Sequence, residues 1–271
     1  RAEDSFAAIL PRANVLFRVT DNLNVFATVS KGRRSDTVQL GAQATPNGPI
    51  ASLTPVLAET VWNYEVGVKL STPLVSGSVG AFWQDYKNFQ VSVLEGGNPI
   101  PVTRSAGTAT AKGVEAEISV RPTSWFNLFG NVAYIEAGID NKPSIAANFR
   151  GARFRLQPEW QASGGFTIDV PVGDAFRVFA TPSITHRSSL FFETPNTAAT
   201  LQGPVTLVNV RAGVGFGRDG KQFEIVGFAR NLFDKDYLLD AGNTGGGAAF
   251  GIPTYIPAEP RLYGVQLSAR F

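Results

Sequence analysis

The chain has 271 residues, of which 17% are charged, and its formal net charge is +2. A charged fraction of about 25% is typical of soluble domains, whereas a mean hydropathy near zero excludes a bundle of membrane helices. The small net charge gives no reason to expect a nucleic-acid partner, and a single histidine excludes a multi-histidine metal site.

Alternation of apolar and polar residues predicts about eleven β-strands. Successive side chains of a strand point to opposite faces, so this pattern produces one apolar face and one polar face. In residues 155–170 the apolar face carries no charge over about 15 residues, more than the ~9–11 that a tilted strand needs to cross a bilayer. The predicted strands cover residues 13–20, 23–32, 62–71, 75–91, 114–121, 125–135, 155–170, 176–185, 206–214, 221–232 and 263–271.

The connections between these strands alternate between short and long. A soluble β-sandwich also alternates in polarity, but its strands are shorter and its connections lack this asymmetry. Short inner turns and long outer loops are typical of outer-membrane barrels. Two uncharged stretches, Thr37–Ala58 and Ala241–Ala258, contain several Gly and Pro and are interpreted as loops. We therefore predict an all-β protein, an antiparallel transmembrane β-barrel.

The strand count also predicts that the barrel is incomplete. Bacterial single-chain barrels have even strand numbers, and an open sheet edge cannot persist in lipid. Doubling eleven gives about 22 strands, the size of plugged outer-membrane transporters. We expect residues 1–271 to form the C-terminal half of such a barrel. The chain has no methionine, so Arg1 is not expected to be the natural start of the gene product.

Aromatic residues near the ends of the predicted strands indicate where the membrane surface lies. Amphipathic rings favour the headgroup level of a bilayer, although core packing is the alternative for any one of them. The residues assigned to this interface are Trp83, Tyr86, Trp125, Tyr134 and Trp160.

Five motifs, taken together and in order, resemble the barrel region of TonB-dependent receptors. The resemblance covers nearly all of the chain. The segments that carry it are Glu59–Lys69 (ETVWNYEVGVK), Gly80–Gln90 (GAFWQDYKNFQ), Gly113–Pro122 (GVEAEISVRP), Ala229–Tyr237 (ARNLFDKDY) and Pro260–Phe271 (PRLYGVQLSARF).

The resemblance implies active import of a scarce nutrient across the outer membrane of a Gram-negative bacterium, with a ferric siderophore or similar chelate as the leading cargo. It implies an N-terminal plug and a TonB box that engages the TonB energy-transducing complex, and neither is visible in these residues. It further implies contact with outer-membrane lipid and lipopolysaccharide, and no cofactor apart from the cargo. Tyr263 and the terminal Phe271 resemble the aromatic signal that the barrel-assembly machinery reads.

Candidate ligand contacts follow only from position near the outer strand ends. Arginine suits anionic chelates, and loop aromatics can stack on a ligand. Loop packing and lipopolysaccharide contact are the alternative roles. The arginines are Arg33, Arg34, Arg150, Arg153 and Arg187, and the aromatics are Phe191, Phe192, Phe250 and Tyr255.

Other chemistry is less well supported by the sequence. The GxGxxG match at residues 215–220 lies between two predicted strands and is interpreted as a hairpin turn. His186 could pair with Ser188 or Ser189 in a hydrolase, but neighbouring residues on one strand rarely form a catalytic triad. We expect no enzyme; a passive porin and a surface binding protein anchored by its barrel remain open.

Two further interpretations concern particular polar residues. Glu115 and Glu117 share one strand face and are expected to join a lattice with Arg and Lys from neighbouring strands. Asn231 and Asp234 are expected to shape the exit from a strand into a loop rather than to bind a ligand.

Overall fold

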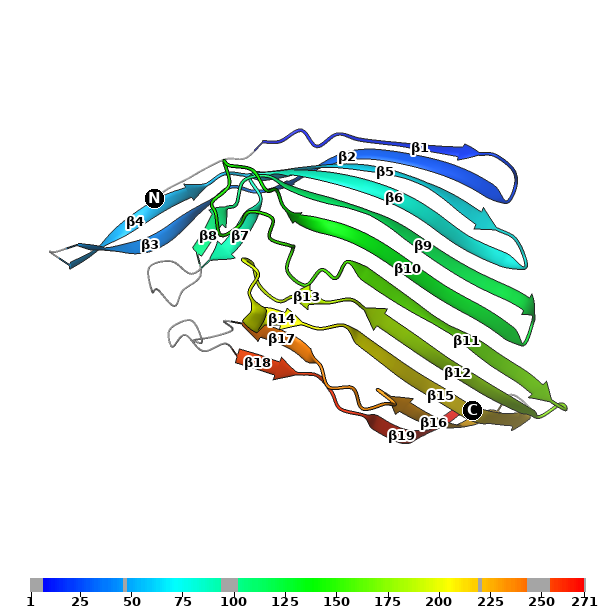
Figure 1. Cartoon of the computed structure of the whole chain (residues 1–271). Helices are drawn as coiled ribbons and strands as arrows, with labels where there is room; N and C mark the ends of the chain where they lie inside the picture. The colour runs from blue at the N-terminus through cyan, green and yellow to red at the C-terminus, as the bar shows by residue number, and fades with distance from the viewer. Residues whose placement is uncertain (1–6, 46–47, 94–101, 219–220, 243–253, 271) are drawn as a thin grey trace.

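One antiparallel sheet of eleven strands dominates the computed structural model, which describes residues 7–45, 48–93, 102–218, 221–242 and 254–270. The sheet bends into an open trough (Figure 1). The eleven predicted strands and their antiparallel arrangement are confirmed. In sheet order, the strands are β1 (Arg12–Arg18), β2 (Leu23–Arg34), β5 (Glu59–Ser71), β6 (Val75–Lys87), β9 (Ala109–Thr123), β10 (Phe126–Ile139), β11 (Trp160–Val172), β12 (Phe176–Arg187), β15 (Val205–Arg218), β16 (Lys221–Arg230) and β19 (Leu262–Arg270).

The two ends of the sheet differ as predicted. Short turns join the strands at one end, here called the turn end, and long connections lie at the other, the loop end (Figure 1). In their described parts, the long connections carry four small two-stranded sheets and one 3-10 turn, η1 (Ala198–Thr200). The small sheets pair β3 (Thr37–Thr45) with β4 (Gly48–Val56), β7 (Gln90–Val93) with β8 (Val102–Ser105), β13 (Leu190–Phe191) with β14 (Leu201–Gln202), and β17 (Leu238–Gly242) with β18 (Thr254–Pro257).

The described residues of Thr37–Ala58 and Ala241–Ala258, the two stretches interpreted as loops, lie in long connections, and part of them form small sheets. β3 pairs with β4 along its whole length, from Thr37 with Val56 to Thr45 with Gly48, and β17 pairs with β18. Pairing satisfies the backbone N–H and C=O groups that an irregular loop would leave to water. Within the described residues, no helix is long and apolar enough to cross a membrane.

Two predicted strands have different limits in the structure. The strand predicted over residues 155–170 begins only at Trp160, because Leu156 adopts a φ of 61° and its N–H bonds to Phe191 of another connection. Residues 75–91 divide into β6 and β7 at Asn88, where φ is 55°. A positive φ in a residue other than glycine interrupts a strand, and alternation of polarity does not report it.

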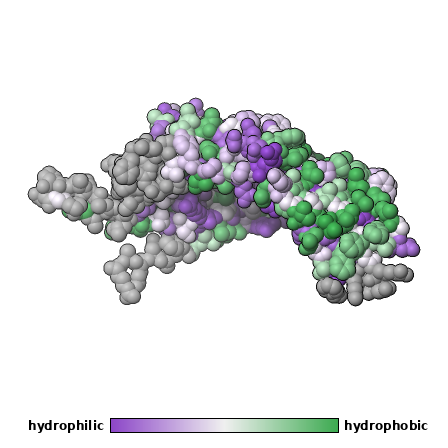
Figure 2. All heavy atoms as spheres, turned by 90° about the horizontal axis from the view of Figure 1, so that it is seen from below, coloured by the Kyte–Doolittle hydropathy of each residue, from purple (hydrophilic) through white to green (hydrophobic). Residues whose placement is uncertain are grey.

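The two faces of the sheet differ in polarity. On the convex face, large apolar side chains are exposed to the surroundings: Val66 is 53% exposed, Val79 53% and Ile118 51%. The concave face is lined by hydrophilic atoms (Figure 2). A continuous exposed apolar face is typical of a protein surface that contacts the lipid of a membrane.

Aromatic side chains form a belt at each end of the convex face. The loop-end belt contains Trp62, Tyr64, Trp83, Tyr134 and Trp160, and the turn-end belt contains Trp125, Phe126, Phe166, Phe176, Phe216 and Phe223. Phe126 and Tyr134 are eight positions apart on β10, which is roughly 26 Å along a strand. If the strand is tilted by ~40° from the barrel axis, the two belts are about 20 Å apart along that axis. This separation approaches the apolar band of about 25 Å in outer-membrane barrels.

Tyr86 does not belong to these belts. It is an odd number of positions from Trp83 on β6, so its side chain points to the opposite face. There its ring packs edge-on against Phe89 and Phe154, with centroid distances of 5.5 and 5.7 Å. Tyr86 therefore contributes to a packed loop core, whereas Trp83, Trp125, Tyr134 and Trp160 lie in the belts.

A phenylalanine lies over a glycine in each of the five hairpins that close at the loop end. In every case the two residues are direct partners in the strand register, on the concave face. A Cβ added to any of these glycines would come within 2.6–2.9 Å of the ring, so the ring occupies the space that the missing side chain leaves free. The five pairs are Phe26 with Gly67, Phe82 with Gly113, Phe129 with Gly165, Phe179 with Gly213, and Phe228 with Gly264.

Candidate functional site

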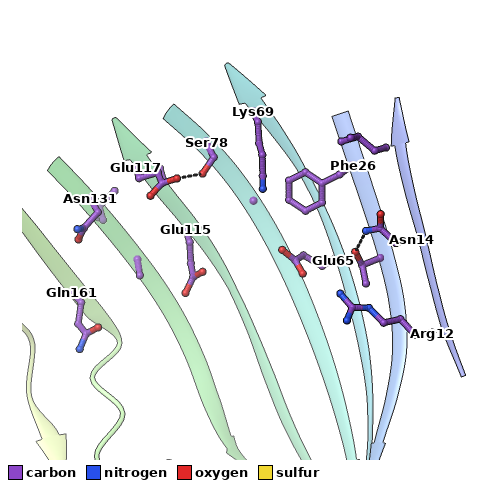
Figure 3. A pocket seen from close by; sticks show the side chains of 16 residues that line it. Arg12, Asn14, Phe26, Glu65, Lys69, Ser78, Glu115, Glu117, Asn131 and Gln161 are labelled. Atoms are coloured by element: carbon purple, nitrogen blue, oxygen red, sulfur yellow. Dashed lines mark hydrogen bonds between the residues drawn. The ribbon is translucent and has the colours of Figure 1, made fainter. Parts of the chain in front are cut away.

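A polar groove of about 790 Å³ runs along the concave face from β1 to β11. Strand alternation directs one residue in two into it, and Figure 3 shows these side chains converging from neighbouring strands. Asn14 donates to Thr28 Oγ1 over 2.7 Å, and Ser78 donates to Glu117 Oε1 over 2.9 Å. The labelled lining residues are Arg12, Asn14, Phe26, Glu65, Lys69, Ser78, Glu115, Glu117, Asn131 and Gln161.

The predicted lattice around Glu115 and Glu117 is not formed. Within the described residues, neither carboxylate lies within 4.0 Å of a lysine or arginine nitrogen; the Lys69 ammonium lies 5.2 Å above the Phe26 ring instead. The register separates Lys69 from Glu117 by a whole strand, because Ser78 of β6 stands between them. The groove is therefore a hydrated wall with spare carboxylate acceptors, suited to contact with polar groups.

The charged lattice lies elsewhere on the concave face, near the turn end. Arg177 of β12 pairs with Asp169 of β11 at 2.7 Å and with Glu224 of β16. Its guanidinium also lies 4.8 Å from the Phe179 ring centroid, and Arg211 lies 5.2 Å from the same ring. Sequence reasoning missed this cluster because Glu224 of β16 is distant in sequence from Asp169 and Arg177, which lie across one short turn.

At the loop end, Arg187 is the candidate arginine that lines a cavity. The cavity measures about 460 Å³ and lies between the ends of β11, β12 and β15 and the segment around Tyr237. The guanidinium lies 5.6 Å from the Tyr237 ring centroid and donates one hydrogen bond to the Leu238 carbonyl over 3.3 Å. Within the described part of the chain, its other N–H groups have no further hydrogen-bond acceptor and are available to an anionic group. Gln161 and Thr185 also line this cavity.

Arg150, Arg153 and Phe192 brace the loops. Arg150 donates to the carbonyls of Ile145 and Pro143 over 2.7 and 2.8 Å. Arg153 donates to the Ser189 carbonyl over 3.1 Å and lies 5.7 Å from the Phe191 ring centroid, which joins two connections. Phe192 is 1% exposed. These contacts favour a structural role for the three residues.

The remaining candidates are dispersed. Arg33 pairs with Asp36 at 2.6 Å and lies on the convex side of β2, away from the trough. Arg34 is exposed at the end of the same strand, and Tyr255 is 49% exposed on β18. Phe250 and Phe271 lie outside the described residues. Among the predicted arginines, Arg187 lines a cavity formed by described residues at the ends of β11, β12 and β15.

A small apolar core holds the connections after β6 and β10 together. Val91, Ala109, Ile139, Ile145 and Phe149 are buried in it. At its edge, Asp140 accepts hydrogen bonds from Thr108 over 2.6 Å, Thr110 over 3.0 Å and Lys142 over 2.6 Å. Burial by itself would raise the pKa of Asp140, but these hydrogen bonds and the Lys142 charge lower it below the ordinary value of 3.8.

This shift predicts acid sensitivity of the connection. A carboxylate whose pKa is lower in the folded than in the unfolded protein stabilises the fold at a pH above the pKa of the unfolded state. This stabilisation is lost as the pH falls through the pKa of the folded state. We expect amide hydrogen exchange in residues 140–152, corrected for its intrinsic rate, to accelerate below about pH 4. The Asp140→Asn variant should exchange faster than the wild type at neutral pH and show a smaller acceleration with acid. Equal pH dependence in both proteins would contradict this role for Asp140.

The serine and histidine residues at the end of β12 do not form a catalytic pair. His186 Nδ1 lies 2.8 Å from Thr206 Oγ1, and Ser188 Oγ accepts the Trp160 backbone N–H over 3.0 Å. His186 lies on the convex face, because its register partners Ala162 and Thr206 do. Each group is therefore used within the sheet.

Asn231 and Asp234 shape the exit from β16, as expected. Asn231 accepts the Lys235 N–H over 2.8 Å, and its side-chain amide donates to the Lys235 carbonyl over 3.0 Å. Asp234 accepts the Arg261 N–H over 2.8 Å. Both residues have a positive φ, 49° and 54°, which Asn and Asp tolerate better than most residues.

Comparison with known proteins adds a family match to this geometry. The model of the family described as TonB dependent receptor-like, beta-barrel matches residues 1–232. The metal-pseudopaline receptor CntO of Pseudomonas aeruginosa is 30% identical over 161 residues, which cover 58% of this chain and 20% of the relative. The matched segment thus spans about a fifth of the curated relative.

Solved structures share the fold. The ferric yersiniabactin uptake receptor FyuA from Yersinia pestis has a TM-score of 0.75 at 19% identity, covering 97% of this chain and 37% of that chain. BauA, the ferric preacinetobactin receptor from Acinetobacter baumannii, has a TM-score of 0.70 at 19% identity, covering 96% and 36%. At this identity the likeness establishes the architecture, an open section of a larger barrel wall.

Proposed function

This chain belongs to the TonB-dependent receptor-like β-barrel family, and from that premise we propose that it is the C-terminal barrel portion of an outer-membrane active transporter. The apolar convex face, flanked by two aromatic belts, supports placement in the outer membrane. In the proposed protein, an N-terminal plug and further strands complete the barrel, and the plug engages the TonB energy-transducing complex.

The cargo that we propose is an anionic metal chelate, such as a ferric siderophore. CntO is a metal-pseudopaline receptor, and FyuA and BauA are receptors for ferric chelates. The single observation on this chain that carries the proposal is Arg187, held between Tyr237 and Leu238 above a cavity of about 460 Å³. Arginine binds carboxylate and phenolate oxygens through several N–H groups, and the adjacent ring favours flat ligands.

The polar side chains of the concave face next to this cavity also support the proposed transport of a polar cargo. Asn131, Gln161 and Ser163 continue from the Arg187 cavity toward the polar groove, so hydrophilic side chains line the way between them. These side chains bind and orient polar groups, and none is placed to carry out bond-breaking chemistry. The proposed role is therefore that of a receptor and transporter and not that of an enzyme.

Uptake of radiolabelled iron chelates by cells producing the full-length protein tests this proposal. We expect Arg187→Ala to weaken binding of the transported chelate by between about tenfold and about a hundredfold, since a charge-assisted hydrogen bond contributes about 1.5–3 kcal/mol. Arg155→Ala is a matched control, because Arg155 is an exposed arginine on a neighbouring connection and lies outside the cavity.

Two results would contradict the proposal. Equal binding by both variants would remove Arg187 from the ligand site. A purified protein that conducts ions continuously in planar bilayers, with no dependence of uptake on TonB, would instead identify a passive channel. Energised uptake requires a closed barrel, and a closed barrel should conduct little.

A further inference from the structure

The Arg187 cavity is completed by a segment that does not belong to the large sheet. Tyr237 and Leu239, in the connection after β16, line it together with the ends of β11, β12 and β15. We call residues 237–239 the closing segment. Because the Arg187 guanidinium contacts the Tyr237 ring and the Leu238 carbonyl, the position of the closing segment determines where its remaining N–H groups point.

Hydrogen bonds fix the backbone of the closing segment on both sides of the contact with Arg187. The Tyr237 carbonyl accepts the Ala258 N–H over 3.0 Å, and the Leu238 N–H donates to Gln202 Oε1 over 2.8 Å. The Leu238 side chain packs against a buried apolar cluster of Leu190, Phe192 and Ala241. The segment is therefore held in place before any ligand enters the cavity.

Gln202 connects the closing segment to a different part of the chain. It lies on β14, in the connection between β12 and β15. Its Nε2 donates to the Gly203 carbonyl over 3.1 Å, which turns Oε1 toward the Leu238 N–H. Gln202 is half-buried and lies outside the Arg187 cavity. It therefore acts on the cavity through Leu238.

Asn231 fixes the chain just before the closing segment. Its side chain accepts the Lys235 N–H and donates to the carbonyls of Lys235 and Glu259, over 2.8, 3.0 and 3.4 Å. Its backbone N–H donates to Asn209 Oδ1 of β15 over 3.0 Å. Asn231 is 6% exposed. Both backbone groups of Lys235, two residues before Tyr237, are thus tied to one buried side chain.

We propose that Gln202 and Asn231 are positioning residues of the ligand site. They hold the closing segment so that the Tyr237 ring and the Leu238 carbonyl orient Arg187 toward an anionic group in the cavity. A guanidinium that is already oriented loses less conformational freedom when a ligand binds, so its hydrogen bonds contribute more to affinity. The inference rests on the proposed function in one respect, that Arg187 binds the cargo.

The test uses the full-length protein purified in detergent and substitutions at Gln202. Gln202→Met has a side chain of the same length without the acceptor, and Gln202→Glu restores an acceptor oxygen. Gln157→Met is the matched control. Gln157 is also a half-buried glutamine in a connection, its amide donates to the Pro158 carbonyl over 2.9 Å, and it lies outside the cavity.

Two measurements report on the site. The first is the rate at which phenylglyoxal modifies Arg187, followed by peptide mapping, with Arg150 in the same sample as the reference. The second is the affinity for benzoate, a carboxylate on a flat ring, measured by ligand-observed NMR. Binding that persists in Arg187→Ala is subtracted as binding outside the cavity.

We expect Gln202→Met to bind benzoate about two- to tenfold more weakly, the effect of one neutral hydrogen bond. Phenylglyoxal should modify Arg187 faster in this variant, because the guanidinium is less firmly held, whereas the rate at Arg150 should not change. Gln202→Glu should restore both values, and Gln157→Met should match the wild type.

Asn231→Asp tests the second positioning residue. Aspartate tolerates the φ of 49° at this position and still accepts the Lys235 N–H, but it lacks the two donors. We expect it to weaken benzoate binding and to accelerate the modification of Arg187 in the same way as Gln202→Met.

Four results would overturn the proposal: no benzoate binding by the wild type, unchanged binding in both Gln202→Met and Asn231→Asp, failure of Gln202→Glu to restore it, or equal acceleration at Arg150 and Arg187. The last would show a general loosening of the loops. Chelate uptake is measured in parallel. Uptake by the wild type that does not depend on TonB would refute the transport function, whereas the modification rates would still test the positioning of Arg187.

Discussion

The substitution Val79→Arg should lower the stability of the folded protein by about 2–4 kcal/mol, the cost of an arginine on the lipid face near the bilayer midplane. Val79 is 53% exposed on the convex face, and its register partners Val68 and Ala116 surround it with apolar groups. No nearby carboxylate on that face can pair with the guanidinium. Urea unfolding of the full-length protein in phospholipid bilayers measures the change.

The neighbouring position provides the control. Ser78 is one residue away on β6, but it points into the concave groove, where its hydroxyl contacts Glu117. Ser78→Arg places the same charge in a hydrated site beside a carboxylate, so we expect a change within about 1 kcal/mol. Similar losses for both substitutions would mean that the convex face is not in lipid.

Alanine at Gly213 should disrupt the sheet more than alanine at any glycine with open surroundings. A Cβ at Gly213 would lie 2.4 Å from the Ile225 carbonyl oxygen and 2.9 Å from the Phe179 ring. The backbone oxygen cannot move without breaking the β15–β16 pairing, so we expect a loss of about 1–3 kcal/mol or more. The temperature at which the folded band disappears in semi-native gel electrophoresis measures it.

The equivalent pair of Gly264 and Phe228 tests the contact with the ring without a clash against the backbone. The three atoms nearest to the Cβ added at Gly264 all belong to the Phe228 ring, the closest at 2.8 Å. Gly264→Ala should therefore destabilise the wild type but cost little in a Phe228→Ala background, whereas Phe179→Ala should not rescue Gly213→Ala. Gly227→Ala is the control, because its nearest neighbour would be 3.9 Å away. Absence of coupling between positions 228 and 264 would contradict the fit of ring over glycine.

Much of the candidate site could not be predicted from the sequence. Strand phase determines whether a side chain faces the trough, so the polar lining from Glu65 to Gln161 followed from alternation. Arg150 lies in a connection and has no such phase, whereas Arg187 is the last residue of β12 and lies beyond the strand predicted over residues 176–185. In the sequence, Arg150 and Arg187 are equal candidates for ligand contact. In the structure, Arg150 donates hydrogen bonds to the carbonyls of Ile145 and Pro143, whereas Arg187 lines a cavity.

The amino-acid sequence by itself determined the eleven strands, their two faces and the alternation of short and long connections. It could do so because a strand crossing lipid must keep one face apolar along its whole length, and this constraint is local. Only the tertiary structure decided which residues meet across strands. The Phe–Gly pairs and the Asp169–Arg177–Glu224 cluster depend on the register between neighbouring strands of the sheet. Register is set by pairing of the whole sheet, which no single segment encodes.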